Sequence, residues 1–271
     1  MLEIFQYDFM INAFIAGILI GIIIPCIGVV VVLRRLSIMG DALSHVSLAG
    51  VAAGLVFGIN PILSAVVFAV AASLCIERIR KSIPKYGEIS TAVIMSVGIG
   101  LAAILSGFVT SANFNSFLFG SLVAISPFEK YLIIVLSIVV LAIFLLLYRA
   151  LFYITFDEES ARLAGIPVQP VTIVFTVLTA VTISISSRVV GALVVSSMMV
   201  LPVAVSMQIA KSYRQTVIFS VLFSIFYVVL GLFLSFYFNL KPGGTIVMTG
   251  VISLIITLLT KNFKGIVKKG A

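Results

Sequence analysis

The sequence predicts an all-α protein that crosses a membrane about nine times. Hydrophobic residues make up 62% of its 271 residues, and charged residues make up only 10%. A soluble domain cannot carry this balance, because it would expose too much apolar surface to water. Nine apolar runs are each near the length of about 17–25 residues that an α-helix needs to cross a bilayer. We therefore expect a single transmembrane domain over residues 1–271, or eight spans if one early segment does not cross fully.

The nine runs follow one another with short breaks. They lie at residues 9–33, 37–59, 61–79, 89–108, 129–148, 168–187, 189–210, 215–237 and 244–260. Asn60-Pro61 separates the second run from the third, and this dipeptide favours a turn. The stretch 109–128 begins too polar to cross. We expect its apolar tail, Phe117 to Ser121, to lie in the interface or to re-enter the membrane on the outer side.

Lysine and arginine residues fall mainly on one side of this arrangement. If the N-terminus lies outside, fourteen of the seventeen face the cytoplasm, which is the side that attracts them in membrane proteins. These are Arg34, Arg35, Arg78, Arg80, Lys81, Lys85, Arg149, Arg162, Lys211, Arg214, Lys261, Lys264, Lys268 and Lys269. Lys130, Arg188 and Lys241 fall on the outer side. We expect a cytoplasmic C-terminus with a basic tail at 261–271, and the net charge of +8 then needs no nucleic acid as partner.

The run at 37–59 carries an acid and the only histidine of the chain, His45. Asp41 precedes His45 by four residues, so both side chains can touch one bound ion. Ser37 and Ser44 share their face. The opposite side is expected to carry Ile38, Met39, Ala42, Leu43, Val46, Ala49 and Gly50. A helix that begins near Leu36 places His45 about 13–14 Å into a hydrocarbon core about 30 Å thick, and ionisable groups at that depth face a cavity or a partner.

Aspartate and neutral imidazole are both ligands of zinc, and either also suits manganese. Asp41 and His45 cannot complete a tetrahedral zinc site alone. Either a twofold homodimer supplies both residues twice, or the site stays incomplete so that the ion can leave. The alternative is structural, with Asp41 bonded to a neighbouring serine and His45 to a carbonyl. Cys26 and Cys75 lie in apolar runs and are expected to be small buried residues rather than metal ligands.

Two later stretches add candidate functional residues. Within 189–210, small residues that include Gly191 and Ser196 permit close helix packing, and Pro202 should kink the helix and free a carbonyl. Packing alone can explain them; the alternative is that Ser196 and Pro202 line a pathway. In the cytoplasmic loop 155–167, Thr155 or Asp157 can cap a short helix that ends at Gly165-Ile166-Pro167.

That short helix has acidic residues in its first turn, Glu158 and Glu159, which suits the helix dipole. Its apolar residues are Phe156, Ala161, Leu163 and Ala164, and they have no core of their own to bury them. Such a surface suits docking into another protein. The alternative is a solvated connector.

The stretch VLRRLSIMGDALSHVSLAGVAAGLVFGINP, residues 32–61, resembles the second-helix signature of the zinc and manganese permeases of bacterial ATP-binding-cassette importers. Four later stretches resemble the same family: EISTAVIMSVGIGLA, FLFGSLVAIS, TFDEESARLAGIP and GALVVSSMMVLPVAVSMQIA. The resemblance implies a homodimeric subunit of the bacterial cytoplasmic membrane, which associates with a cytoplasmic ATPase dimer and receives metal from an extracytoplasmic binding protein. It also implies that Asp41 and His45 coordinate the transported metal and that 155–167 enters a groove on the ATPase. The residues that match this coupling segment are Phe156, Asp157, Glu158, Glu159, Ala161, Arg162, Leu163 and Gly165.

The chain has no G-x-x-x-x-G-K-[ST] phosphate loop, so ATP chemistry must belong to another polypeptide and the chain is not expected to be an enzyme. No permanently bound cofactor is expected. The sequence from His45 to Gly50 resembles the zinc branch, because manganese members often carry a proline just before that glycine. A second histidine, common in zinc permeases, is absent. Zinc is therefore the expected cargo and manganese the alternative. The other alternative is an ATP-independent secondary transporter of metal or other cations. Such a protein should carry more charged residues inside the membrane than Asp41 and His45.

Overall fold

The computed structural model describes residues 6–82, 87–109, 111–120 and 126–269, and within these ranges the chain forms helices and no strands. The helices are α1 (Asp8–Leu33), α2 (Ser37–Phe57), α3 (Pro61–Ser82), α4 (Gly87–Ser106), α5 (Ser111–Phe119), α6 (Pro127–Phe156), α7 (Glu158–Leu163), α8 (Val168–Val189), α9 (Ala192–Ile209), α10 (Tyr213–Phe238) and α11 (Pro242–Lys269). Among the described residues, nine of these helices are long and apolar enough to cross a membrane; α5 and α7 are too short. The all-α expectation with nine spans is confirmed.

Most helix ends lie close to their predicted positions, and the exceptions have local causes. α6 continues through Arg149 to Phe156, although the apolar run ends at 148. A long arginine side chain can reach the membrane surface without breaking backbone hydrogen bonds, so a charge near a helix end does not stop the helix. α9 begins at Ala192 and not at 189, because Gly191 has φ +99° and turns the chain between α8 and α9.

Side-chain caps fix several helix starts. The Asn60 carboxamide accepts hydrogen bonds from the backbone N–H groups of Ile62 and Leu63 at 3.0 and 3.2 Å, which confirms the turn at Asn60-Pro61. Ser126 and Glu129 form a reciprocal capping box at the start of α6. These caps satisfy backbone N–H groups that have no partner inside the helix.

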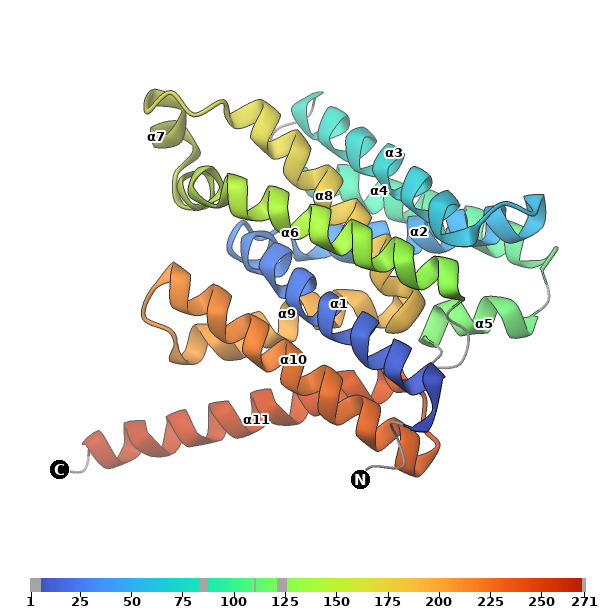
Figure 1. The fold of residues 1–271 in the computed structure, drawn as a ribbon. Coiled ribbons are helices and arrows are strands. Elements are labelled where there is room, and N and C mark those ends of the chain that lie inside the picture. Colours follow the sequence, from blue (N-terminus) through green and yellow to red (C-terminus); the bar gives the residue numbers. More distant parts are fainter. Residues whose placement is uncertain (1–5, 83–86, 110, 121–125, 270–271) are drawn as a thin grey trace.

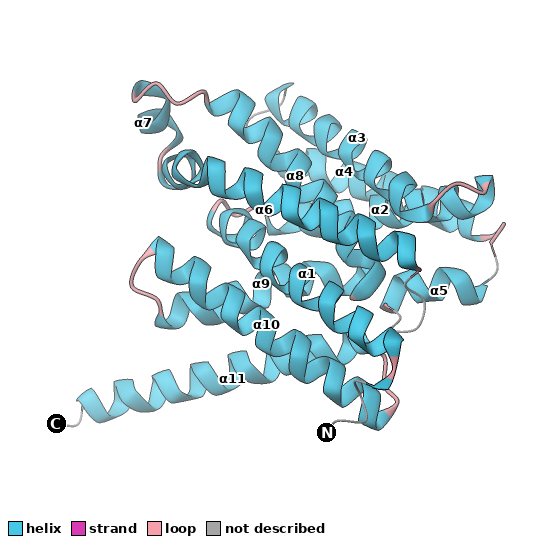
Figure 2. Cartoon of the chain, viewed as in Figure 1, coloured by secondary structure: helices cyan, strands magenta, loops and turns pink. Residues whose placement is uncertain are grey.

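The helices pack around α1, α2 and α8, which bury the largest parts of their surfaces (Figures 1 and 2). α1 contacts α6, α8, α9 and α10, whereas α2 contacts α3, α4, α8 and α9. The outer helices expose apolar side chains such as Val67 on α3, Ile104 on α4 and Leu146 on α6. Apolar groups on the outside of a bundle suit contact with lipid.

The connections gather at the two ends of the bundle (Figure 1). The turn 34–36, helix α7 and the turn 210–212 lie at one end, together with the C-terminal part of α11. Helix α5 and the connection 239–241 lie at the other end. This grouping agrees with the alternation expected from the lysine and arginine residues, and we name the two ends the basic end and the α5 end.

Two expectations about individual segments need correction or refinement. Cys26 is buried as expected, but Cys75 is exposed on α3, because its position on the helix points away from the bundle. The apolar tail of 109–128 forms the end of α5, and Phe117 is buried against the protein and does not lie free in the interface. α5 packs on α2, α8 and α9. Ser121 lies outside the described residues.

Glycine allows α2 and α4 to approach closely next to His45. A Cβ atom added at Gly98 of α4 would lie 2.7 Å from Cγ2 of Val46 and 2.8 Å from its backbone nitrogen. A backbone atom cannot move aside as a flexible side chain can. The close approach therefore depends on the missing side chain at Gly98.

We predict that Gly98→Ala lowers the stability of the folded protein by about 1–3 kcal/mol, because it overpacks the α2–α4 contact. The matched control is Gly100→Ala on the same helix, where an added Cβ meets no atom within 4 Å. Alanine favours helix over glycine, so this control should be neutral or slightly stabilising. The measurement is the midpoint of thermal unfolding in detergent; equal midpoints for both variants would contradict the prediction.

Candidate functional site

α2 places Asp41 and His45 one turn apart on the same side of the helix, and both residues are partly buried. Met39, Ala42 and Leu43 are buried on the other side, as expected. Ile38 departs from the expectation, because it is 50% exposed and lies beside the polar stripe. At 100° per residue, Ile38 points in nearly the same direction as His45. It therefore belongs to the polar side of the helix although its side chain is apolar.

Asp41 opens onto a groove of about 460 Å³ between four helices. α2 contributes Ser37, Ile38 and Asp41. The other walls come from Met95 of α4, Ser196, Ser197, Val200 and Leu201 of α9, and Val247 and Val251 of α11. Polar groups from α2 and α9 thus meet in an otherwise apolar wall, as in a membrane site that holds a hydrophilic ligand.

The contact between Asp41 and Ser196 joins two segments that are far apart in the sequence. The Ser196 hydroxyl donates a long hydrogen bond of 3.4 Å to Oδ1 of Asp41. α9 is held beside α2 at this level because Gly40 leaves room for Met199, whose sulfur would lie only 3.3 Å from a Cβ at Gly40. Met199 lies about one turn from Ser196, so this packing sets the distance between the serine and the carboxylate.

The remaining pathway candidates lie in different places. Ser37 lines the groove beside Asp41. Ser44 is buried, and its hydroxyl donates to the carbonyl of Gly40 on its own helix at 2.9 Å. Pro202 is buried inside α9, beyond the residues that line the groove. It lacks the N–H that would bond to the carbonyl of Met198, so it weakens the helix close to the serines.

Within the described residues, the side chains around Asp41 and His45 do not complete a metal site. In the described parts of the chain, no group of three or more His, Cys, Asp or Glu residues is placed to hold one ion. Asp41 and His45 are two potential ligands on one helix face. A tetrahedral zinc site needs two more, and these must come from water, from another protein or from a second copy.

The segment 155–167 forms the expected short helix, α7, at the basic end. Asp157 both ends α6 and caps α7, because its carboxylate accepts from the N–H groups of Glu159 and Ser160 and from the Ser160 hydroxyl. These hydrogen bonds lower the pKa of Asp157 below its usual range. The bond from the Ser160 hydroxyl contributes most, and the bonds from the backbone N–H groups add to it. Gly165, with φ +80°, redirects the chain toward α8.

Some apolar residues of this segment pack against the protein, and others are exposed. Ala161 is 1% exposed and packs into the bundle, which differs from our expectation. Phe156 contacts Phe152 and Tyr213, with ring centroids 5.2 and 6.1 Å apart. Leu163 is 90% exposed. The helix is therefore anchored by Ala161 and presents Leu163 outward.

Sequence reasoning missed an ion pair at the α5 end. Arg188, at the end of α8, and Glu129, near the start of α6, have almost fully buried side chains, and Nε lies 3.1 Å from Oε1. A terminal nitrogen of Arg188 donates to Oε2 at 3.1 Å. The guanidinium also lies 4.4 Å from the ring centre of Phe117, so it joins α5 to α6 and α8.

A signal for this pair was present in the sequence. Glu129 and Arg188 have opposite charges, and the expected topology places both at the outer ends of spans. The distribution of lysine and arginine residues, however, assigns Arg188 only to the outer side. Its burial follows from the packing of α5 on α8, which no local pattern reveals.

Comparison with known proteins places the chain in a family. Residues 6–261 match the family described as the ABC 3 transport family. The chain belongs to this family. The match covers the nine candidate membrane spans, of which the last is Pro242–Lys261, and the groove. The resemblance seen in residues 32–61 thus extends over nearly the whole fold, and it is confirmed.

Members of the ABC 3 transport family from several organisms are similar over nearly their full lengths. A probable metal transport system membrane protein of Treponema pallidum is 35% identical, with 94% of this chain and 95% of the relative covered. The manganese import system permease protein ScaB of Streptococcus parasanguinis is 30% identical, with 93% and 90% covered. The high-affinity zinc uptake system membrane protein ZnuB of Haemophilus influenzae is 25% identical, with 94% and 99% covered.

The solved structure of PsaBC from Streptococcus pneumoniae in complex with Fab superposes with a TM-score of 0.84. It is 28% identical, and 94% of this chain and 92% of that chain are covered. Family membership confirms that the chain is a multi-pass membrane component of a transporter and not an enzyme.

We predict that Arg188→Gln and Glu129→Gln each destabilise the permease by about 3–5 kcal/mol, because each leaves a buried charge without its partner. The double variant Arg188→Gln/Glu129→Gln should be more stable than either single variant. The measurement is the thermal unfolding midpoint in detergent, with Lys130→Gln as the control on a half-buried neighbouring cation. Additive losses in the double variant would contradict a paired role.

Proposed function

We propose that this chain is the membrane-spanning subunit of an ATP-driven importer that carries divalent transition-metal ions into the cell, with zinc as the favoured cargo. The observation that carries the proposal is the placement of Asp41 in the groove between α2 and α9, with His45 one turn along the same face. A carboxylate inside a membrane span is costly unless it serves a polar pathway.

Asp41 and His45 are the proposed metal-coordinating residues. Ser37 and Ser196 line the same groove and can offer hydroxyl oxygens to a hydrated ion that passes Asp41. Ser44 lies deeper in the packing, and Pro202 has an indirect part in the pathway, because it weakens α9 next to Ser196. One chain alone offers two protein ligands, and binding by two ligands would be weak and reversible.

A homodimer would supply the missing ligands. The groove is open on the side formed by α2, α4, α9 and α11, and α4 and α11 also expose apolar residues such as Val97 and Ile252. Two copies that meet on this side would bring two Asp41 and two His45 residues to a shared axis. That set matches the four ligands of a tetrahedral zinc ion.

ATP hydrolysis is assigned to a separate cytoplasmic ATPase dimer, and metal delivery to an extracytoplasmic binding protein. α7 is the proposed contact with the ATPase, because it projects from the basic end and presents Leu163 outward beside Glu158, Glu159 and Arg162. Phe156 and Gly165 fix its two ends, and Asp157 caps it.

Different observations support zinc and manganese as the transported ion. The residues from His45 to Gly50 lack the proline of many manganese permeases, and a site with one imidazole and one carboxylate from each copy suits zinc. Manganese is the second candidate, because the manganese permease of Streptococcus parasanguinis is 30% identical to the chain. Uptake of one metal in competition with the other, measured in vesicles with all three components, decides between them.

Replacement of Asp41 by Asn or His45 by Ala should lower ATP-driven metal uptake at least about ten-fold, because each removes one of two ligands from the pathway. The control is Asp8→Asn, which changes an exposed carboxylate at the start of α1. Uptake is measured in vesicles that contain the permease, its ATPase and its binding protein. Wild-type uptake by both site variants would refute the proposed pathway.

Asp157→Ala should weaken the association of the permease with its ATPase, because α7 loses its N-terminal cap. Asp157→Asn should retain most of this association, since asparagine also caps helices well. Because its pKa lies below the usual range, Asp157 stays ionised at neutral pH, and its contribution to α7 is lost only as the pH falls through that lowered value. The measurement is co-purification of the ATPase with each variant. Equal recovery with alanine and asparagine would contradict this role of the cap.

A further inference from the structure

The basic end contains an ion pair between the proposed coupling helix and the turn that leads into α2. A terminal guanidinium nitrogen of Arg34 lies 3.2 Å from Oε2 of Glu158, the first residue of α7. The Arg34 side chain is only 9% exposed, and that of Glu158 is 47% exposed. The pair is therefore partly shielded from water and stronger than a typical surface pair.

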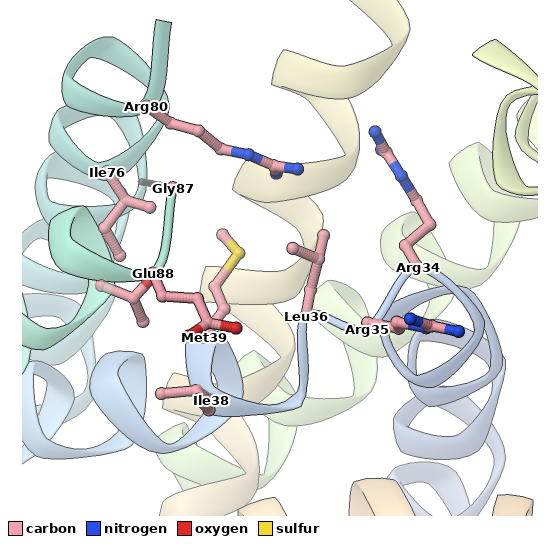
Figure 3. A pocket seen from close by; sticks show the side chains of 10 residues that line it. Arg34, Arg35, Leu36, Ile38, Met39, Ile76, Arg80, Gly87 and Glu88 are labelled. Carbon is pink, nitrogen blue, oxygen red and sulfur yellow. The ribbon is translucent and has the colours of Figure 1, made fainter. Parts of the chain in front are cut away.

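Arg34 sits among several charges that limit its choice of partner. It lines two neighbouring pockets at the basic end, one of which is shown in Figure 3 with Arg35, Arg80 and Glu88. Burial lowers the pKa of Arg34 most, and the nearby positive charge of Arg80 lowers it further. Glu158 and Glu77 act in the opposite direction, because their carboxylates favour the charged form of Arg34. Glu158 also pairs with Arg162 on α7 at 3.6 Å. Arg34 thus depends on a carboxylate of the coupling helix to offset its burial.

The turn that holds Arg34 is closed by backbone hydrogen bonds. The backbone N–H of Arg34 donates to the carbonyl of Val30 at 2.9 Å, and the backbone N–H of Leu36 donates to the carbonyl of Val31 at 2.8 Å. Arg35, with φ +57°, takes the left-handed conformation that closes this type of helix end. α2 begins at Ser37, immediately after the turn, so Asp41 lies only about 6 Å along the helix from its start.

From this arrangement we infer that Arg34 is a positioning residue that links α7 to α2 through Glu158. The inference rests on the proposed function. A displacement of α7 pulls on the guanidinium of Arg34, the bonded turn carries the force, and the start of α2 moves with Asp41. The link gives the metal-bearing helix a direct connection to the segment assigned to the ATPase, in addition to the path along α6.

The test is a double-mutant cycle with Arg34→Gln and Glu158→Gln in the complete transporter. Metal transported per ATP hydrolysed is measured in vesicles, because this ratio reports coupling and not the amount of folded protein. Each single variant should lower the ratio about five-fold, and the double variant should lower it no further than the singles. An additive loss, or a wild-type ratio in either single variant, would overturn the inference.

Two matched controls test whether any change of charge at this end has the same effect. Arg35→Gln changes the adjacent arginine of the turn, and Glu88→Gln changes an exposed carboxylate of the neighbouring pocket. Both should keep the wild-type ratio of metal to ATP. If the wild-type transporter itself shows no ATP-driven metal uptake, the proposed function fails, and that outcome is distinct from a failure of the link alone.

A second measurement does not depend on transport. Spin labels on cysteines placed at Ile38 and Glu159, in a background with Cys26 and Cys75 replaced, report the distance between the start of α2 and α7. Arg34→Gln should broaden this distance distribution in the permease alone, and Arg35→Gln should not. Identical distributions in both variants would show that the ion pair does not hold α7 to the turn.

Discussion

The structure depends on one constraint: a carboxylate inside a membrane span must be given polar surroundings by other helices. Asp41 meets this constraint through the groove it shares with α9, where the Ser196 hydroxyl donates to it. Two nearby glycines also help to meet this constraint, because they allow close packing of the helices. Gly40 leaves room for Met199, and Gly98 leaves room for Val46. Close helix packing therefore places the polar groups, and no strong local interaction of Asp41 does so.

The two ends of the bundle use charge in different ways. At the α5 end, Arg188 and Glu129 are buried together, and their pair fastens α5 over two long helices. At the basic end, Arg34 and Glu158 form a pair that is buried on one side only. A fully buried pair resists separation, because each charge would be left in an apolar medium. In the pair at the basic end, Arg34 is shielded from water, whereas Glu158 stays partly exposed and also pairs with Arg162.

Much of the fold could be predicted from the sequence, and the reason is the strength of the apolar runs. Nine spans, the turn at Asn60-Pro61 and the short helix capped by Asp157 follow from length and capping residues alone. The pairing of Asp41 with Ser196 could not be predicted, because 155 positions of sequence separate them. Ala161 and Cys75 show the same limit, since their exposure depends on which neighbour covers them, whereas the direction of Ile38 follows from helix geometry.

The continuity of α6 has a consequence for how the two faces of the membrane communicate. Glu129 lies near one end of this uninterrupted helix, and Asp157 joins the other end to α7. The span between them is about 40 Å, so a tilt of about five degrees at one end displaces the other by about 3–4 Å. If α7 contacts an ATPase as proposed, such a tilt of α6 would also strain the Arg188–Glu129 pair at the α5 end.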